Sequence, residues 1–385
     1  MCPTSNGQKD GYTIWERLDR AAATIDWLEI FSDTKVVHLE CRSSNHKPIL
    51  IFPTGIPKKN QRPWRFEHMW LKEEGCHASM EAVWNQAILG DPMKKVEIKI
   101  DKFQANLKWW SKTAFENVTK QLKEKKNLRK AKEAVIRGGT MEGVLKLKKE
   151  IKELLVKEEK MWKQRSRDLW LHEGDKNTCY FHSRATQRYR QNKICELMDS
   201  EGQRCTKEDD VAQVLIGYYQ GLFNSANPCN MDQAMADIPP LITPEMNDML
   251  QEDYTRAEVD KALHQMEALK ASGPDGMPPL FFQHYWQTIG DDVLAVVLSC
   301  VDIGSIPPFI NKTFITLIPK VKSPTLVTEY RPISLCNILY KLVSKVIANK
   351  LKRILPNLIL DSQSAFRSDK AISDIFWWHT KLYTI

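Results

Sequence analysis

The sequence predicts a mainly α-helical protein with small β elements, an α+β chain. Between Lys94 and Gln164 three glycines interrupt a long helical pattern and no proline does. Apolar residues recur at helical spacing again from Ser334 to Leu355. Strand-like apolar runs are short, at 47–52 and 313–318. Helices therefore supply most of the expected core, and strands enter only as short pairs.

Length and charge indicate more than one functional surface. A chain of 385 residues exceeds the usual size of one domain, so two or three units are expected. The net charge is +8 over 121–170 (16 basic and 8 acidic residues), −9 over 201–260 and +8 over 306–360. This alternation, with an overall charge of +8, favours a polyanionic partner bound at separate basic surfaces.

Several protein classes are disfavoured. The nine cysteines form no C-x-x-C pair, which argues against a zinc knuckle or a disulfide framework and favours reduced thiols. There is no apolar run of about 18 residues and no signal-peptide pattern. We therefore expect an intracellular protein, nuclear or cytoplasmic, that is neither secreted nor bound to a membrane.

The region 61–200 is expected to be a basic, tryptophan-rich helical linker. Gly138-Gly139 predicts the break between two antiparallel helices. Apolar residues of the second helix approximate one stripe, and lysines and glutamates cover the rest. The stripe consists of Leu145, Leu147, Ile151, Leu154, Leu155 and Met161. The charged residues fit either a solvated helix face or contacts with a nucleic-acid backbone.

A distinctive block, Trp170-Leu171-His172-Glu173-Gly174-Asp175-Lys176-Asn177-Thr178-Cys179-Tyr180-Phe181-His182, closes these helices. Arg184 and Arg188 follow it, interleaved with aromatic rings. Rings can stack on unpaired bases while arginines contact phosphates, but a turn with packed aromatic side chains explains the block equally well. The block has no second ligand cluster for zinc.

The region 251–385 contains an ordered series of motifs. Thr255 and Glu258 form a capping box, and the helix they begin is expected to reach Gly273-Pro274. Gly273-Pro274-Asp275-Gly276 predicts a tight turn, and the strand 313–318 ends at Pro319-Lys320. Tyr330-Arg331-Pro332-Ile333-Ser334 begins the returning segment. The helix expected over 334–355 has apolar residues on one side and Lys341, Lys345 and Lys352 on the other. Gln363-Ser364-Ala365-Phe366 follows.

In this order, the motifs resemble the front half of the reverse transcriptase of plant non-LTR (LINE-type) retrotransposons. The resemblance implies that 251–385 is the fingers part of that domain, with the palm absent. The acidic charge and the prolines of 201–250 indicate a connector before it. It implies that Lys320 and Arg331 contact the incoming nucleotide, since an arginine can grip phosphate bidentately and a lysine adds a point charge. The face with Lys341, Lys345 and Lys352 is expected to meet a template backbone or solvent. Arg184 and Arg188 are expected to contact nucleic acid. RNA, DNA and a dNTP are the expected partners.

The resemblance also covers the N-terminus. Ser44-Asn45-His46 and the strand after it resemble the closing segment of the endonuclease that precedes the polymerase in these elements. His46 matches the family histidine, and Asn45 replaces an aspartate. An amide cannot supply the charge that a divalent-metal site requires. We therefore interpret 1–55 as a remnant of an endonuclease domain, with no metal site.

No catalytic residue is assigned. In the resembled family the Mg²⁺-binding aspartates lie in a palm that would follow Ile385, so we expect the chain to hold no cofactor and to be inactive alone. Asp291-Asp292 lies in a predicted helix and matches no palm hairpin. The leading hypothesis is therefore a truncated reverse-transcriptase-like protein. The alternative is a non-catalytic nucleic-acid-binding protein derived from a retroelement. A further alternative is a gene-model fragment.

Overall fold

The computed structural model describes residues 4–9, 12–16, 20–31, 34–38, 49–53, 63–113, 115, 117–135, 141–167, 178–225, 227, 233, 236 and 240–359. The helices are α1 (Ile25–Ile30), α2 (Glu74–Trp84), α3 (Pro92–Thr113), α4 (Val118–Val135), α5 (Met141–Ser166), α6 (Thr178–Asn192), α7 (Glu208–Phe223), α9 (Pro244–Gln251), α10 (Arg256–His264), α11 (Pro279–His284), α12 (Trp286–Ile303), α13 (Pro308–Asn311), α14 (Ile338–Leu351) and α15 (Leu355–Leu358). Two 3-10 helices are η1 (His68–Lys72) and η2 (Val327–Glu329). The strands are β1 (Thr4–Lys9), β2 (Tyr12–Glu16), β3 (Lys35–His38), β4 (Ile49–Phe52), β5 (Leu197–Met198), β6 (Arg204–Cys205), β7 (Thr313–Pro319) and β8 (Tyr330–Cys336).

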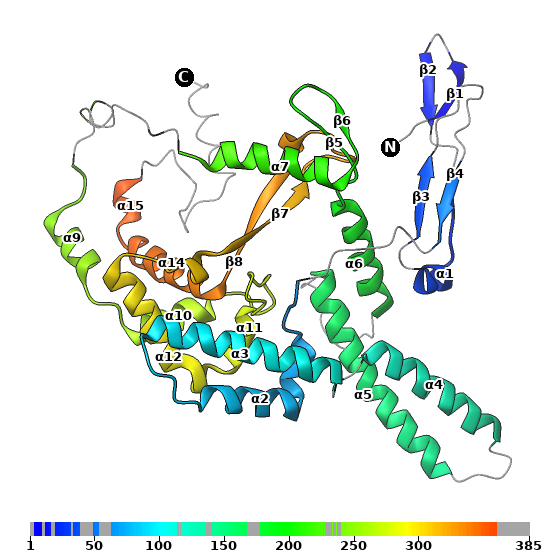
Figure 1. Cartoon of the computed structure of the whole chain (residues 1–385), viewed down its shortest axis with the longest axis horizontal. Coiled ribbons are helices and arrows are strands. Elements are labelled where there is room, and N and C mark those ends of the chain that lie inside the picture. Colours follow the sequence, from blue (N-terminus) through cyan, green and yellow to red (C-terminus); the bar gives the residue numbers. More distant parts are fainter. Residues whose placement is uncertain are drawn as a thin grey trace, which may run out of the picture. The chain divides into compact units, whose positions relative to one another are not determined.

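The chain is mainly α-helical with short two-stranded sheets, which confirms the predicted fold class (Figure 1). It divides into two compact units. Unit 1 comprises residues 1–63, 179–218 and 317–332, and unit 2 comprises 64–178, 219–316 and 333–385. The domain boundaries expected from the motifs stay predictions. Contacts between residues place the helices that follow residue 64 in the same unit as the helices that follow residue 256.

Unit 1 contains antiparallel strand pairs. Strand β1 pairs with β2, and β3 pairs with β4. The sequence Met198-Asp199-Ser200-Glu201-Gly202 predicts a hairpin turn, and the short hairpin β5–β6 turns at Gly202, whose φ of 80° favours glycine. Met198 N–H also donates to the Thr325 carbonyl at 2.8 Å. This hydrogen bond fastens β5 to the loop that follows β7.

Unit 2 has one apolar core built from both halves of the sequence. Helix α3 packs against α2 and α12, and α14 packs against α10 and α12 (Figure 1). Phe281 of α11 is fully buried and stacks on Phe103 of α3 at 5.2 Å between ring centroids. Phe66, also fully buried, lies 5.7 Å from Phe281. The tryptophan-rich helices therefore share their core with the motif-bearing ones.

Helices α4 and α5 form the predicted antiparallel hairpin, which Figure 1 shows as two helices lying side by side. Val118 and Leu122 of α4 and Leu147 and Ile151 of α5 are buried. Leu145, which the expected stripe includes, is 58% exposed. Position 145 is rotated by about 200° from Leu147, so it cannot share that side of the helix. Its place in the stripe was therefore wrong.

Helix α10 begins as predicted and ends earlier than predicted. The capping box of Thr255 and Glu258 is present in full. The helix stops at His264, well before Gly273-Pro274. The Gln283 side chain donates to the carbonyls of Leu263 and Met266 at 3.0 and 2.8 Å. The Leu263 carbonyl also accepts the Met266 N–H at 3.1 Å, so backbone and side chain together fix the chain where it leaves the helix.

Helix α14 begins later than the sequence predicts. Residues 334–336 belong to β8, which pairs with β7, and the helix starts at Ile338 after Asn337. Pairing with β7 satisfies the backbone of these residues and overrides the helical periodicity. Further along, Leu339, Leu342, Val343, Val346 and Ile354 are buried, as predicted. Leu335, predicted on the same face of this helix, is instead half-buried in β8.

Candidate functional site

The loop between β7 and β8 holds the two residues expected to contact a nucleotide. Lys320 N–H donates to the Glu329 carbonyl at 2.7 Å, so these two residues lie opposite each other. Continuing this antiparallel register places Arg331 opposite Ile318, on the same face of the pair as Lys320. Both side chains are exposed. The hairpin therefore brings the two predicted cations together as diagonal neighbours.

Hydrogen bonds within the loop organise this pair. The Lys320 ammonium donates to the Thr328 carbonyl at 2.8 Å, which leaves further N–H donors of the ammonium available. The Glu329 carboxylate accepts the backbone N–H groups of Thr325 and Leu326 at 2.8 and 3.1 Å. These bonds lower the pKa of Glu329, and they direct its charge into the loop rather than toward the cations.

Arg184 and Arg188 lie one turn apart on α6, and both are exposed. The aromatic residues of this segment divide between two roles. Phe181 is fully buried, whereas Tyr180 and Tyr189 are 37% and 47% exposed. Phe181 therefore serves the packing of the core, whereas the exposed rings of Tyr180 and Tyr189 lie on the same helix as the exposed arginines. The earlier part of the motif, residues 170–177, lies outside the described residues, as do His46 and the block 363–366.

The three lysines predicted on the free side of α14 have different surroundings. Lys341 donates to the Ala271 carbonyl at 3.0 Å and is half-buried, and burial lowers the pKa of its amino group. Lys345 is half-buried as well, and Lys352 is exposed just after the helix. Lys341 therefore braces the chain segment before the Gly-Pro-Asp-Gly turn. Lys352 is the most accessible of the three to a polyanion.

Lys350 is a buried cation that the sequence reading overlooked. Its side chain is 2% exposed, its ammonium donates to the Glu252 carbonyl, and it lies 3.8 Å from the Tyr254 ring centroid. The bond and the aromatic face compensate for removing the charge from water. Lys350 lies four residues after the buried Val346 and so continues the apolar stripe of the helix. This position was the sequence signal for its burial.

The Gly-Pro-Asp-Gly turn is a junction for unit 2. The Asn337 side chain accepts the Asp275 N–H at 3.2 Å and donates to the Phe309 carbonyl at 2.8 Å. Gln104 of α3 donates to the Asp275 carbonyl at 2.9 Å, and Phe66 N–H donates to the Gly276 carbonyl at 3.0 Å. The turn thus joins segments from both halves of the sequence.

Asp275 lines a small cavity of about 220 Å³ beside the turn. Asp101, Gln104, Lys312 and Asn337 also line it. Burial raises the pKa of Asp275 from 3.8 to about 7, while the hydrogen bond from Met277 N–H and the Lys341 charge act in the opposite direction. Near neutral pH the carboxyl is therefore divided between its neutral and charged forms.

This raised pKa predicts a pH-dependent stability. Between pH 4 and 7 native Asp275 holds a proton that the unfolded chain has lost, so stability falls as pH rises through this range and levels off above it. The pKa difference corresponds to at most about 4 kcal/mol. Asp275→Asn should flatten the dependence and raise the melting temperature at pH 8 in thermal scans, whereas exposed Asp302→Asn should do neither. A lower melting temperature for Asp275→Asn at pH 8 would contradict this prediction.

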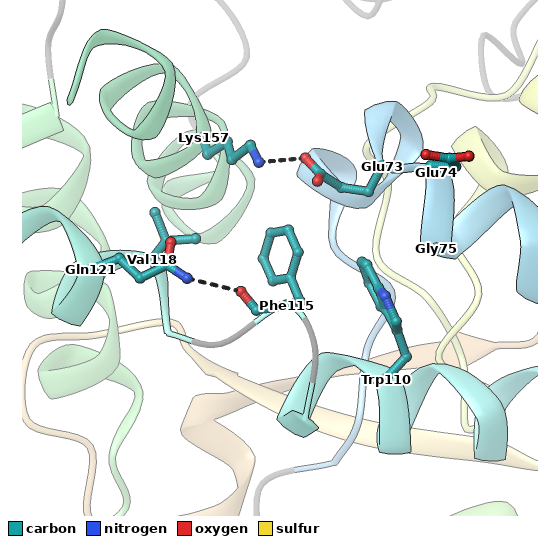
Figure 2. Close-up of a pocket in the computed structure, with 8 residues that line it drawn as sticks. All are labelled: Glu73, Glu74, Gly75, Trp110, Phe115, Val118, Gln121 and Lys157. Atoms are coloured by element: carbon teal, nitrogen blue, oxygen red, sulfur yellow. Dashed lines mark hydrogen bonds and ion pairs between the residues drawn. The ribbon is translucent and has the colours of Figure 1, made fainter. Parts of the chain in front are cut away.

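Another cavity, of about 320 Å³, lies where α2, α4 and α5 meet the end of α3. Figure 2 shows Lys157 and Glu73 reaching toward each other across it, with an ion pair at 2.7 Å. The Lys157 ammonium also lies 5.3 Å from the Phe115 ring centroid. Gln121 donates to the Phe115 carbonyl at 3.4 Å. These paired groups stabilise the helix junction.

The adjacent aspartates of α12 are held in ion pairs. Asp292 accepts from Lys99 at 2.7 Å, and Asp291 pairs with Arg256. Both links join α12 to neighbouring helices of unit 2. Within the part of the chain that the structure describes, no three histidine, cysteine or carboxylate side chains are grouped to hold a metal ion.

Comparison with known proteins yields a partial match. No protein-family model matches the chain. It is 28% identical over 212 residues to a Xenopus laevis protein named "Transposon TX1 uncharacterized 149 kDa protein". The match covers 54% of this chain and 16% of that protein, so the chain spans about a sixth of its relative. The similarity supports a transposon-derived protein. Among the described helices, none is long and apolar enough to span a membrane.

Proposed function

We propose that the chain is a piece of a non-LTR retrotransposon protein in which the β7–β8 hairpin contacts an incoming nucleotide. Three observations support this reading: the motif order, the similarity to a transposon protein, and the hairpin itself. The hairpin carries the most weight, because its register places Lys320 and Arg331 side by side on one face.

The chemistry of this pair suits a triphosphate. Arg331 supplies a planar fork of N–H donors, and Lys320 supplies a compact charge on the neighbouring strand. The nearest acid in sequence, Glu329, is engaged with backbone N–H groups, so it competes weakly for the two cations. In this proposal the hairpin binds and orients the nucleotide, and Mg²⁺-binding carboxylates belong to another part of the element's protein.

Removing either cation should weaken nucleotide binding. We expect Lys320→Gln and Arg331→Gln each to raise the Kd of a fluorescent dNTP at least tenfold, because a charge-assisted hydrogen bond contributes about 1.5–3 kcal/mol. Titration of the full chain, with and without Mg²⁺, measures this. Lys322→Gln is the matched control, since Lys322 is an exposed lysine of the same loop.

Two results would refute the nucleotide site. One is equal weakening by Lys322→Gln and Arg331→Gln, which would indicate a diffuse charge effect. The other is a wild-type chain that binds no dNTP at millimolar concentration.

A second candidate is a non-catalytic nucleic-acid-binding protein. The exposed Arg184 and Arg188 on α6, with Tyr180 beside them, favour it. The two candidates differ in a measurable way, because a purely nucleic-acid-binding protein would shift RNA or DNA in a gel at low salt and fail to bind a free dNTP.

A further inference from the structure

Four lysines of the α4–α5 hairpin share one surface, which we call the lysine face: Lys123, Lys126, Lys148 and Lys152. All four side chains are exposed. Each directly follows a residue that α4 or α5 directs toward the other helix. Lys123 follows Leu122, and Lys126 follows Lys125, whose ammonium bonds Glu150 across the hairpin at 2.5 Å. Lys148 and Lys152 follow the buried Leu147 and Ile151.

Helix geometry places these four on the same side of the hairpin. Successive residues of a helix are rotated by about 100°, so each lysine is displaced from the helix contact in the same rotational sense. In an antiparallel pair this rotation leads to one common side of both helices. Lys148 and Lys152 lie one turn apart, about 6 Å along the axis, and packed helix axes are about 8–10 Å apart.

Within residues 118–129 and 143–155, the acids of the hairpin lie on the opposite side. Glu124, Glu150 and Glu153 each directly precede an inward residue, so they are rotated the other way. Two of them are neutralised there: Glu150 pairs with Lys125, and Glu124 lies 3.9 Å from Lys120. Among residues 118–129 and 143–155, no acid directly follows a residue that points toward the other helix. No lysine of the face has an ion-pair or hydrogen-bond partner among the described residues.

From this separation of charge we propose that the lysine face binds the phosphate backbone of a nucleic-acid duplex without reading its bases. Four unpaired ammonium groups within about 10 Å match the dense, regular charge of a duplex, which has a phosphate every 3.4 Å along each strand. The face presents no aromatic ring among its described residues, so stacking on unpaired bases has no platform here. This proposal is separate from the proposed nucleotide contact and does not depend on it.

The salt dependence of binding tests the proposal. The full chain is titrated into a fluorescent duplex of arbitrary sequence at several salt concentrations. Replacing all four lysines of the face by glutamine should weaken binding at least about tenfold at low salt. It should also reduce the slope of log Kd against log salt by about 3–4, nearly one per lost phosphate contact.

A control variant removes the same charge elsewhere. Lys72, Lys112, Lys120 and Lys146 are exposed residues of unit 2 outside the face, and replacing these four by glutamine should leave the slope within about one of wild type. Circular dichroism checks that both variants retain their helices. If the quadruple face variant loses helicity, the double variant Lys148→Gln and Lys152→Gln should still reduce the slope by about two.

Three outcomes overturn the proposal. The wild-type chain could fail to bind the duplex at 50 mM salt. Both quadruple variants could lower the slope equally, which would reduce the effect to net charge. Finally, the face variant could bind the duplex normally and lose binding to phosphatidylserine vesicles, which would assign the face to a membrane surface. Failure of the nucleotide proposal at Lys320 and Arg331 is measured separately, by dNTP titration, so the two proposals can fail independently.

Discussion

Replacing Gly273 by alanine is expected to lower the free energy of unfolding by about 3 kcal/mol or more. A Cβ at this position would lie 2.5 Å from the Asn337 backbone nitrogen and 2.5 Å from the Cys336 carbonyl carbon. Backbone atoms cannot move aside as a flexible side chain can, so α14 would have to shift away from the turn. Chemical denaturation followed by circular dichroism measures the loss.

Gly217→Ala provides the comparison. Gly217 lies inside α7, and apart from the adjacent backbone of its own helix, no atom of the described residues lies within 4 Å of the position its Cβ would occupy. Alanine there should leave stability unchanged or raise it by up to about 1 kcal/mol. Similar midpoints for Gly273→Ala and Gly217→Ala would show that the turn and α14 are not in close contact.

Phe281→Ala is expected to cost about 3–5 kcal/mol, because it empties a fully buried ring position that the core can refill only in part. The ring contacts Phe66 and Phe103, which come from far earlier in the sequence. The loss should therefore appear in one cooperative transition that includes α3. Denaturation followed by tryptophan fluorescence, with Trp84 beside Phe281 as a reporter, measures it.

Phe314→Ala is the matched control, since Phe314 is 40% exposed and its loss should cost well under that amount. If Phe281→Ala melted the C-terminal helices while α3 kept its helicity in a separate transition, the shared core would be disproved.

Local structure was predictable wherever it depends on neighbouring residues. The capping box at Thr255 and Glu258, the turn at Gly202 and the strand ending at Pro319 all follow from short-range rules, and the structure contains each of them. The errors in the limits of two helices arose where a distant group intervenes. Gln283 bonds the carbonyls of Leu263 and Met266 where the chain leaves α10, and pairing with β7 delays α14.

The candidate site shows the same division. The motif order placed Lys320 and Arg331 on adjacent strands, and the two-stranded sheet brings them together. The sequence could not show that Lys341 turns to the Ala271 carbonyl, or that Asp275 is enclosed beside α3 and α14. Both depend on contacts between residues more than 60 positions apart, and periodicity carries no information about them.

The contact between Phe103 and Phe281 also constrains how such a chain can evolve. Recombination could exchange the motif-bearing C-terminal segment without the earlier helices. Phe281 of one parent would then face an α3 surface from the other parent to which it is not fitted. Substitutions on either side of this contact are then selected jointly. Inheritance should preserve the two stretches as a pair, even though more than 150 residues of chain lie between them.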